Sequence, residues 1–319
     1  MTGVLQNLGG RIMATYQRVQ DSKAALWLRL AFMAAILGYL GFKIYAIGWQ
    51  DVLRALPVNP AFYLIFVLIY LALPVSDILI YQRLWHMKLG RYAAFFLRKQ
   101  VYNAALVGYS GEMVFCFWAQ EHLGLPASKA LSAIKDNNIL SAMASNLVTV
   151  VLVAAFVLGG RLDLLSAGTP AIMATLLGGL GFVLLVSVLF ARFHKRLITL
   201  PARQAAYVFG VHLARVSLVA ALQVLQWHLV IPQAPVSVWL AFLTAQFVLT
   251  RIPFLPNKDL VFLGLTLNLT GLVNAPGAVV AGMFVAFGAL MQLANLAVYA
   301  AASASEAVGG AIRRHRGLA

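Results

Sequence analysis

The sequence predicts an all-α polytopic membrane protein, with about six full spanning helices and two oppositely oriented broken or re-entrant hairpins arranged as an inverted repeat. Three observations lead to this fold class. Hydrophobic residues make up 62% of the chain and charged residues only 10%, whereas a soluble domain carries about a quarter charged residues. Apolar runs of spanning length recur along the chain. Two further apolar stretches are interrupted by Gly or Pro together with polar residues.

The apolar runs place the elements in order. Residues 1–25 form a cytoplasmic interfacial segment, because apolar residues recur there at helical spacing between basic ones. A single transmembrane domain covers 26–302, with a first half at about 61–158 and a second half at about 170–302, and 303–319 form a basic cytoplasmic tail. The predicted full spans are 26–47, 61–82, the helix that ends at Leu158, 170–191, 204–230 and 278–302.

The distribution of basic residues predicts the orientation. With the N-terminus in the cytoplasm, only Arg54 and Arg161 lie outside, and the amphipathic basic segment 83–99 lies on the cytoplasmic face. This excess on one side is the positive-inside pattern, which also argues against a nucleic-acid-binding face. The predicted cytoplasmic basic residues are Arg11, Arg18, Lys23, Arg83, Lys88, Arg91, Arg98, Lys99, Arg192, Lys195, Arg196, Arg203, Arg313, Arg314 and Arg316.

The stretch 103–145 organises the first half. It is apolar but is broken by Gly and Pro into pieces of roughly a dozen residues, which are too short to cross a bilayer. A second interrupted stretch, 236–272, follows in the second half. We expect the piece 103–126 to enter from the cytoplasm and 236–272 from the opposite side. The predicted breaks lie at Gly108, Gly111, Pro126, Pro253 and Pro256.

Paired, interrupted segments at matching places in two halves point to a transporter's central site. Each stretch also carries a Lys-Asp pair, Lys135-Asp136 and Lys258-Asp259. The residues expected to bind substrate in a polar cavity are Asp77, Glu112, Lys135, Asp136, Asn137, Asn138, Arg215, Arg251, Lys258 and Asp259.

Each candidate has a structural reading beside the functional one. Glu112 is expected to contact a cationic head group or to pair with Lys135, or else to cap an interrupted helix. Lys135 and Asp136 point about 100° apart on a helix, so each is expected to meet a partner from another segment rather than the other. Asp77, just after Pro74, is a candidate counter-ion.

The second half supplies the cationic candidates. Arg251 and Lys258 near a half-helix end would suit a phosphate through charge and free backbone donors. Arg215 lies mid-span on a polar stripe with His212, Gln223 and Gln226, and this stripe either lines a cavity or makes interhelical hydrogen bonds.

Several activities find no support in the sequence. The histidines lack metal-ligand spacing, no Walker A motif occurs, and we expect neither an enzyme nor a bound cofactor. The single cysteine, Cys116, lies in an apolar stretch and is expected to be inert.

Four features together resemble a known family. They are the basic amphipathic segment, Gly111-Glu112 in a broken hairpin, the run LGLPASKALSAIKDNNILSAMASNLV and the late run LTRIPFLPNKDLVFLGLTLNLTGL. This order is similar to the lysylphosphatidylglycerol synthase transmembrane region, the flippase-type domain of bacterial multiple peptide resistance factors, which also occurs as a stand-alone chain. The resemblance covers the chain from the second span to the last. In the family's second motif, glycines stand where this chain has Asn257, Lys258 and Asp259.

The resemblance implies a lipid flippase or transporter of the bacterial inner membrane, whose substrate is a phospholipid, glycolipid or isoprenoid-type lipid. One alternative is a non-catalytic membrane partner that presents lipid to a glycosyltransferase or a lipid-modifying enzyme. Another is a small-solute secondary carrier. The oligomeric state, including a homodimer, is left open.

Overall fold

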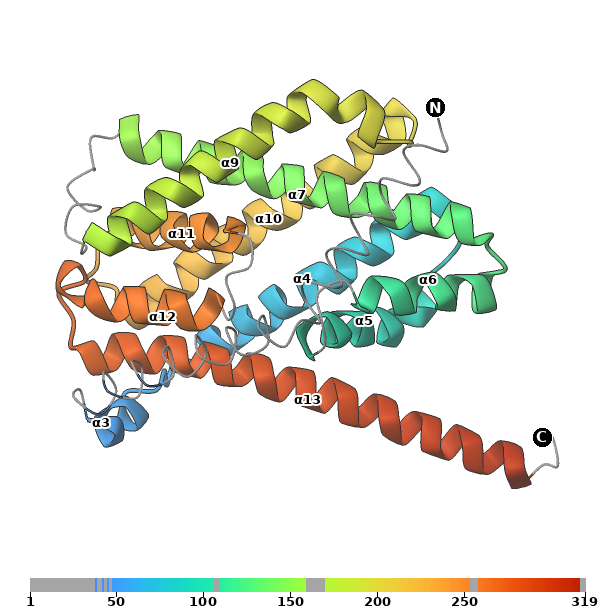
Figure 1. Cartoon of the computed structure of the whole chain (residues 1–319). Helices are drawn as coiled ribbons and strands as arrows, with labels where there is room; N and C mark the ends of the chain where they lie inside the picture. Colours follow the sequence, from blue (N-terminus) through green and yellow to red (C-terminus); the bar gives the residue numbers. More distant parts are fainter. Residues whose placement is uncertain are drawn as a thin grey trace.

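The computed structural model describes residues 48–105, 110–158, 170–252 and 258–315, together with Gly38, Phe42 and Tyr45. Within these ranges the regular structure is helical, without strands (Figure 1). Four of the described helices are long and apolar enough to cross a membrane, namely α4, α7, α10 and α13. The interfacial segment 1–25, nearly all of the predicted span 26–47 and the predicted breaks at Gly108, Pro253 and Pro256 lie outside the described residues.

The helices follow the predicted order, with shifted ends. Their bounds are α3 Trp49–Arg54, α4 Pro60–Trp85, η1 Gly90–Tyr92, α5 Ala93–Ala105, α6 Ser110–Leu123, α7 Ala127–Leu158, α9 Pro170–Leu197, α10 Ala202–Val230, α11 Val236–Arg251, α12 Lys258–Asn268, η2 Thr270–Leu272 and α13 Gly277–His315. Helix α13 continues beyond the predicted last span, 278–302, and ends at His315 within the predicted tail.

The first half contains a pair of short helices between two long ones. The basic segment 83–99 is divided among several elements: α4 ends at Trp85, His86 takes a left-handed conformation, and α5 packs against α4 and α6. Helix α6 ends before Gly124, whose φ of +64° favours glycine. The predicted break at Pro126 is confirmed, since its carbonyl accepts the first backbone hydrogen bonds of α7.

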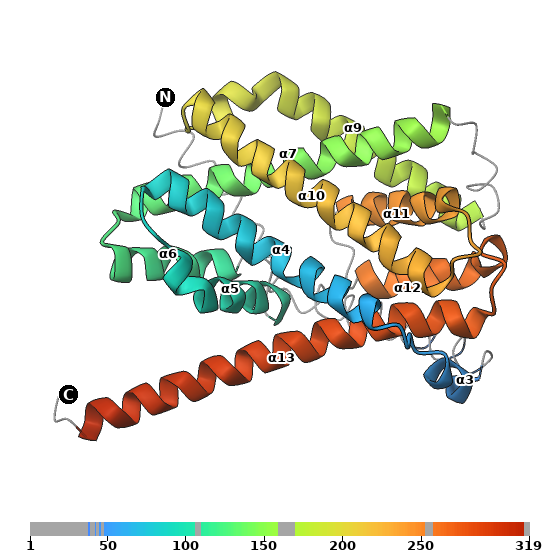
Figure 2. The ribbon, with the colours of Figure 1, turned by 180° about the vertical axis from the view of Figure 1, so that it is seen from behind.

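The second half repeats this order. The long helix α10 is followed by the short helices α11 and α12, which contact each other, and then by the long helix α13 (Figure 2). Helix α11 holds 16 residues and α12 holds 11, so each is shorter than the roughly 20 residues that a full crossing needs. The breaks in the apolar pattern therefore mark the ends of short helices.

The two halves meet through α4 and α10, which run antiparallel. Gln226 of α10 donates a hydrogen bond to the carbonyl of Phe62 at the start of α4, and Tyr207 of α10 donates to the carbonyl of Leu79 near its end. Each half also has its own apolar core. One surrounds Tyr81, Phe96 and Phe115, and the other surrounds Trp239 and Met283.

Candidate functional site

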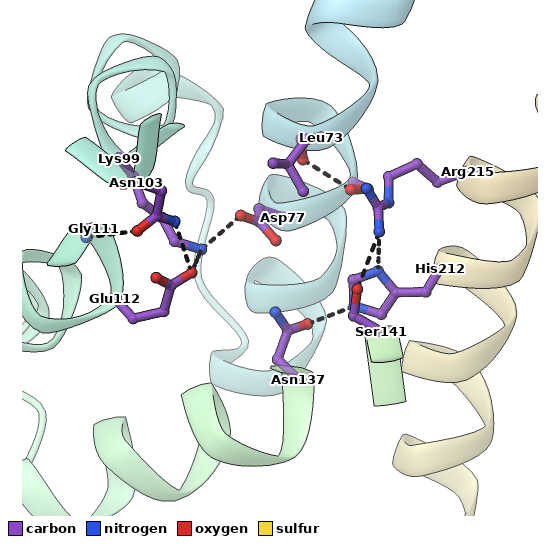
Figure 3. Close-up of polar contacts among 11 residues, drawn as sticks. Leu73, Asp77, Lys99, Asn103, Gly111, Glu112, Asn137, Ser141, His212 and Arg215 are labelled. Carbon is purple, nitrogen blue, oxygen red and sulfur yellow. Dashed lines mark hydrogen bonds and ion pairs between the residues drawn. The ribbon is translucent and has the colours of Figure 1, made fainter. Parts of the chain in front are cut away.

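The centre of the first half is a buried lysine between two carboxylates. Lys99 Nζ of α5 lies 2.7 Å from Asp77 Oδ2 of α4 and 3.4 Å from Glu112 Oε1 of α6 (Figure 3). The three side chains are at most 13% exposed. Charges at this degree of burial persist only when they are paired, since removing each ion from water costs several kcal/mol. Three helices are therefore joined at one point by electrostatics.

The close approach of α5 and α6 positions Glu112 for this contact. The backbone N–H of Gly111 donates to Asn103 Oδ1 (2.8 Å), while Asn103 Nδ2 donates to Glu112 Oε1 (3.1 Å). A Cβ atom at Gly111 would overlap the carbonyl oxygen of Lys99 and lie 2.8 Å from Asn103 Oδ1. Gly111 is therefore needed for helix packing in the first turn of α6, which begins one residue earlier at Ser110.

A second polar chain connects α7 with α10. His212 Nε2 lies 2.9 Å from Asn137 Oδ1, and Arg215 Nη2 donates to Ser141 Oγ (3.1 Å) and lies 3.4 Å from His212 Nδ1 (Figure 3). The predicted polar stripe of α10 thus serves interhelical bonding at His212, Arg215 and Gln226.

A small cavity joins the two groups of contacts. It has a volume of about 40 Å³, which is room for very few water molecules. Its wall includes Asp77, Lys99 and Glu112 on one side and Ser141 and His212 on the other. Asn137 and Asn138 also line it, as predicted for a polar cavity. We call these residues, together with Asn103 and Arg215, the central polar network.

Lys135 and Asp136 lie outside the central polar network, where α7 contacts the connection between α9 and α10. Asp136 is fully buried, and its Oδ2 accepts hydrogen bonds from Thr199 N (2.8 Å), Thr199 Oγ1 (2.6 Å) and Leu200 N (2.9 Å), in the connection between α9 and α10. Lys135 Nζ lies 3.1 Å from Asp136 Oδ1 and donates to the carbonyl of Leu197. Each of the two residues therefore meets a partner from another segment, as predicted. The expectation that they would not also contact each other is wrong, because a flexible Lys side chain reaches its neighbour despite their different directions.

Two further expectations change with this geometry. Glu112 pairs with Lys99, not with Lys135. Lys99 itself, predicted to belong to the basic cytoplasmic surface, is only 4% exposed and is the counter-ion of Asp77. The described contacts of Lys135 and Asp136 are with the α9–α10 connection and with each other. Substrate binding by these two residues stays a prediction.

In the second half, Arg251 ends α11 and Lys258 begins α12. Lys258 Nζ donates to the carbonyl of Thr250, so the two short helices are tied together near their facing ends. The side chain of Asp259 lies outside what the structure describes.

Sequence reasoning missed Lys99, Asn103 and Ser141. The sequence held a clue to Lys99 and Asn103, which are four residues apart and so share a helix face. Asp77 and Glu112 were two acids in apolar surroundings that each needed a cation. Nothing in the sequence pairs Ser141 with Arg215, because that contact depends on how α7 and α10 pack.

Comparison with family models, curated proteins and solved structures finds no match to this chain. Among the described residues, no group of three or more His, Cys, Asp or Glu side chains could hold a metal ion. The site is thus a set of buried charges and amides, paired with one another around a small cavity.

Proposed function

We propose that this protein is a lipid flippase or lipid transporter of the bacterial inner membrane, with the central polar network as the path of the head group. The observation that carries the proposal is the buried triad of Lys99, Asp77 and Glu112 beside a polar cavity, within helices of membrane-spanning length. Ionisable groups inside a membrane protein are costly and commonly mark a substrate or ion pathway.

The arrangement of the helices supports a transporter with two inverted halves. From α4 to α7, and again from α10 to α13, a long helix is followed by two short helices and another long helix, while α9 lies between these two sets in the sequence. The contacts correspond as well: α4 packs on α5 as α10 packs on α11, α6 on α7 as α12 on α13, and α13 on α5 as α7 on α11. The antiparallel course of α4 and α10 supports a second unit that is inverted relative to the first.

In this proposal the two pairs of short helices enter from opposite membrane faces and meet near the central polar network. The head group passes through the polar path while its tails remain in the bilayer. Movement of one half against the other opens the path to each side in turn. A ligand can bias such movement only by binding one state better than the other.

The test is translocation in proteoliposomes that contain fluorescent phospholipids and a fluorescent polyprenyl-phosphate glycolipid, with dithionite quenching of the outer leaflet. Wild-type protein should increase the accessible fraction of at least one lipid, and Lys99→Met and Glu112→Gln should remove this increase. The matched controls are Lys129→Met and Glu121→Gln, because both residues are exposed. Uptake of a soluble solute without lipid movement would instead indicate a secondary carrier.

A second candidate function has one observation in its favour. A groove of about 760 Å³ lies between α5, α6 and α13, with Arg91, Arg98 and Glu121 among its lining residues. A non-catalytic partner that presents lipid to a lipid-modifying enzyme would use such a surface. Under this alternative, Arg91→Gln abolishes function in cells and Glu112→Gln has only a mild effect. Under the transporter proposal, Glu112→Gln abolishes function and Arg91→Gln has only a mild effect.

A further inference from the structure

An apolar groove lies between α7, α10 and α11, apart from the central polar network. It has a volume of about 710 Å³, and among the described side chains that line it only Ser217 and His228 are polar. On α10 the lining includes Leu213, Ser217 and Ala221. At about 100° per residue, these three lie on the opposite side of α10 from Arg215. The groove is therefore a second site, distinct from the one around Lys99.

The groove opens outward, on the surface that a membrane would cover. Four apolar side chains of its lining are 40–57% exposed, namely Leu147, Val151, Leu225 and Leu240. Helices α7 and α10, which carry three of them, are apolar and of membrane-spanning length. In a bilayer these side chains meet hydrocarbon, so the groove is open to lipid chains.

The dimensions of the groove match one acyl chain. Along α10 it runs from Leu213, near the middle of the helix, to His228 in the last turn, a length of about 22 Å. The whole of α10 is about 43 Å long and the hydrocarbon core of a bilayer about 30 Å thick, so the groove covers about one leaflet. The volume spread over this length gives a mean width of about 6 Å, which suits a single hydrocarbon chain.

The two ends of the groove differ in polarity. At the end of α10, the Nδ1 atom of His228 is buried and makes no hydrogen bond within the described residues. An imidazole N–H can donate to the carbonyl of a lipid ester. Towards the middle of α10, the lining ends with the apolar Leu213. This polarity places the ester of a bound lipid at His228 and the end of its chain near Leu213.

We infer that this groove binds one acyl chain of a phospholipid from the leaflet at the C-terminal end of α10. The inference goes beyond the proposed function and does not depend on it, because the groove and the central polar network lie on different sides of α10. The small side chains of Ser217, Ala220 and Ala221 leave space along α10 that the chain fills. The bound lipid thereby holds the short helix α11 against α7 and α10.

The test is photocrosslinking of purified full-length protein in detergent micelles. The probes are two phosphatidylethanolamines, one with a diazirine at the end of a palmitoyl chain and one with the diazirine near the ester. Peptide mass spectrometry locates the labelled residues. Labelling in the groove should saturate as the probe increases, with the chain-end probe at Leu213 and Ser217 and the ester-end probe at Leu225 and His228. Labelling of Leu293, which is 62% exposed on α13, should instead rise in proportion to the probe.

Ala221→Trp places a large side chain in the groove. It should lower the saturable labelling about tenfold, which is the effect of withdrawing about two methylene groups from the site. Leu218→Trp is the matched control and should label as wild type does, because Leu218 is on the same helix, is 55% exposed and does not line the groove. Gel filtration and melting curves show that each variant is folded, and the wild-type pattern tests the inference without any variant.

The inference is overturned if labelling in the groove rises in proportion to the probe, as at Leu293, or if the two probes label the reverse ends. Equal loss of labelling in Leu218→Trp and Ala221→Trp would overturn it too. A wild-type dimer that Ala221→Trp converts to a monomer would assign the groove to a second copy of the chain, against the inference. Saturable labelling without translocation in proteoliposomes would refute the proposed function alone, and translocation without saturable labelling would refute this inference alone.

Discussion

At the scale of single residues, Lys99 is not part of a simple ion pair between two side chains. It serves two carboxylates from two other helices, and its ammonium lies 5.3 Å from the centre of the Phe115 ring and 5.7 Å from that of Tyr81. The aromatic rings exclude water while their faces favour the cation. Loss of the lysine would leave two negative charges close together in a buried site.

We therefore expect Lys99→Met to lower the free energy of unfolding by about 3–5 kcal/mol, the usual cost of breaking a buried pair from one side. Unfolding of the purified protein in detergent micelles, followed by tryptophan fluorescence, measures the change. Lys129→Met, at an exposed position, should change it by no more than about 0.5 kcal/mol.

Adding Asp77→Asn and Glu112→Gln to Lys99→Met should recover part of the loss, because the neutral side chains need no counter-ion. A Lys99→Met protein as stable as wild type, with no gain from the added substitutions, would contradict the buried triad.

At the scale of elements, the short-helix pair α5–α6 is held by close backbone contact as well as by charge. Gly111 stands at a close approach of α5 and α6, and the Asn103 side chain accepts a hydrogen bond from its backbone N–H in the first turn of α6. The Phe115 ring of α6 contacts Tyr81 and Trp85 of α4, and the Phe95 ring of α5 contacts Phe115 and Trp118 of α6. We therefore expect α5 and α6 to move together.

Gly111→Ala should separate the two short helices and destabilise the protein by about 1–3 kcal/mol, because its Cβ meets backbone that cannot move aside alone. Thermal melting in detergent checks this. Gly210→Ala is the matched control: a Cβ there meets nothing within 4 Å, and in the middle of α10 it should be neutral or stabilising by up to about 1 kcal/mol. Equal effects at both positions would show that helix propensity, rather than the α5–α6 contact, decides the outcome.

At the scale of the whole molecule, apolar run lengths were sufficient to predict an all-helical protein with helices of membrane-spanning length, the short helices within 236–272 and the C-terminal end of α10. The first pair of short helices spans 93–123 instead of the predicted 103–126. Apolar run lengths were not sufficient to predict which polar side chains contact each other. The basic residues of 83–99 looked alike in sequence, yet Lys99 is buried because α5 turns back against α4. The Arg215–Ser141 contact arises from the packing of α7 on α10, which no local pattern specifies.

The predicted membrane topology can be tested by cysteine labelling, because the chain has a single natural cysteine, Cys116, that can be replaced. In a Cys116→Ser background, new cysteines at the exposed positions Arg91 and Lys129 flank the α5–α6 pair, while those at Gln233 and Asn274 flank α11–α12. A pair of short helices that enters and leaves the same face places both of its flanks on that face.

We expect a membrane-impermeant maleimide to label the Arg91→Cys and Lys129→Cys variants only from the cytoplasmic side, where the positive-inside pattern places them. The Gln233→Cys and Asn274→Cys variants should react only from the opposite side. The experiment uses intact and inverted membrane vesicles, with the Cys116→Ser protein as the unlabelled control. Labelling of Arg91→Cys and Lys129→Cys from opposite faces would mean that the α5–α6 pair crosses the bilayer, and the two halves would then no longer be inverted copies of one arrangement.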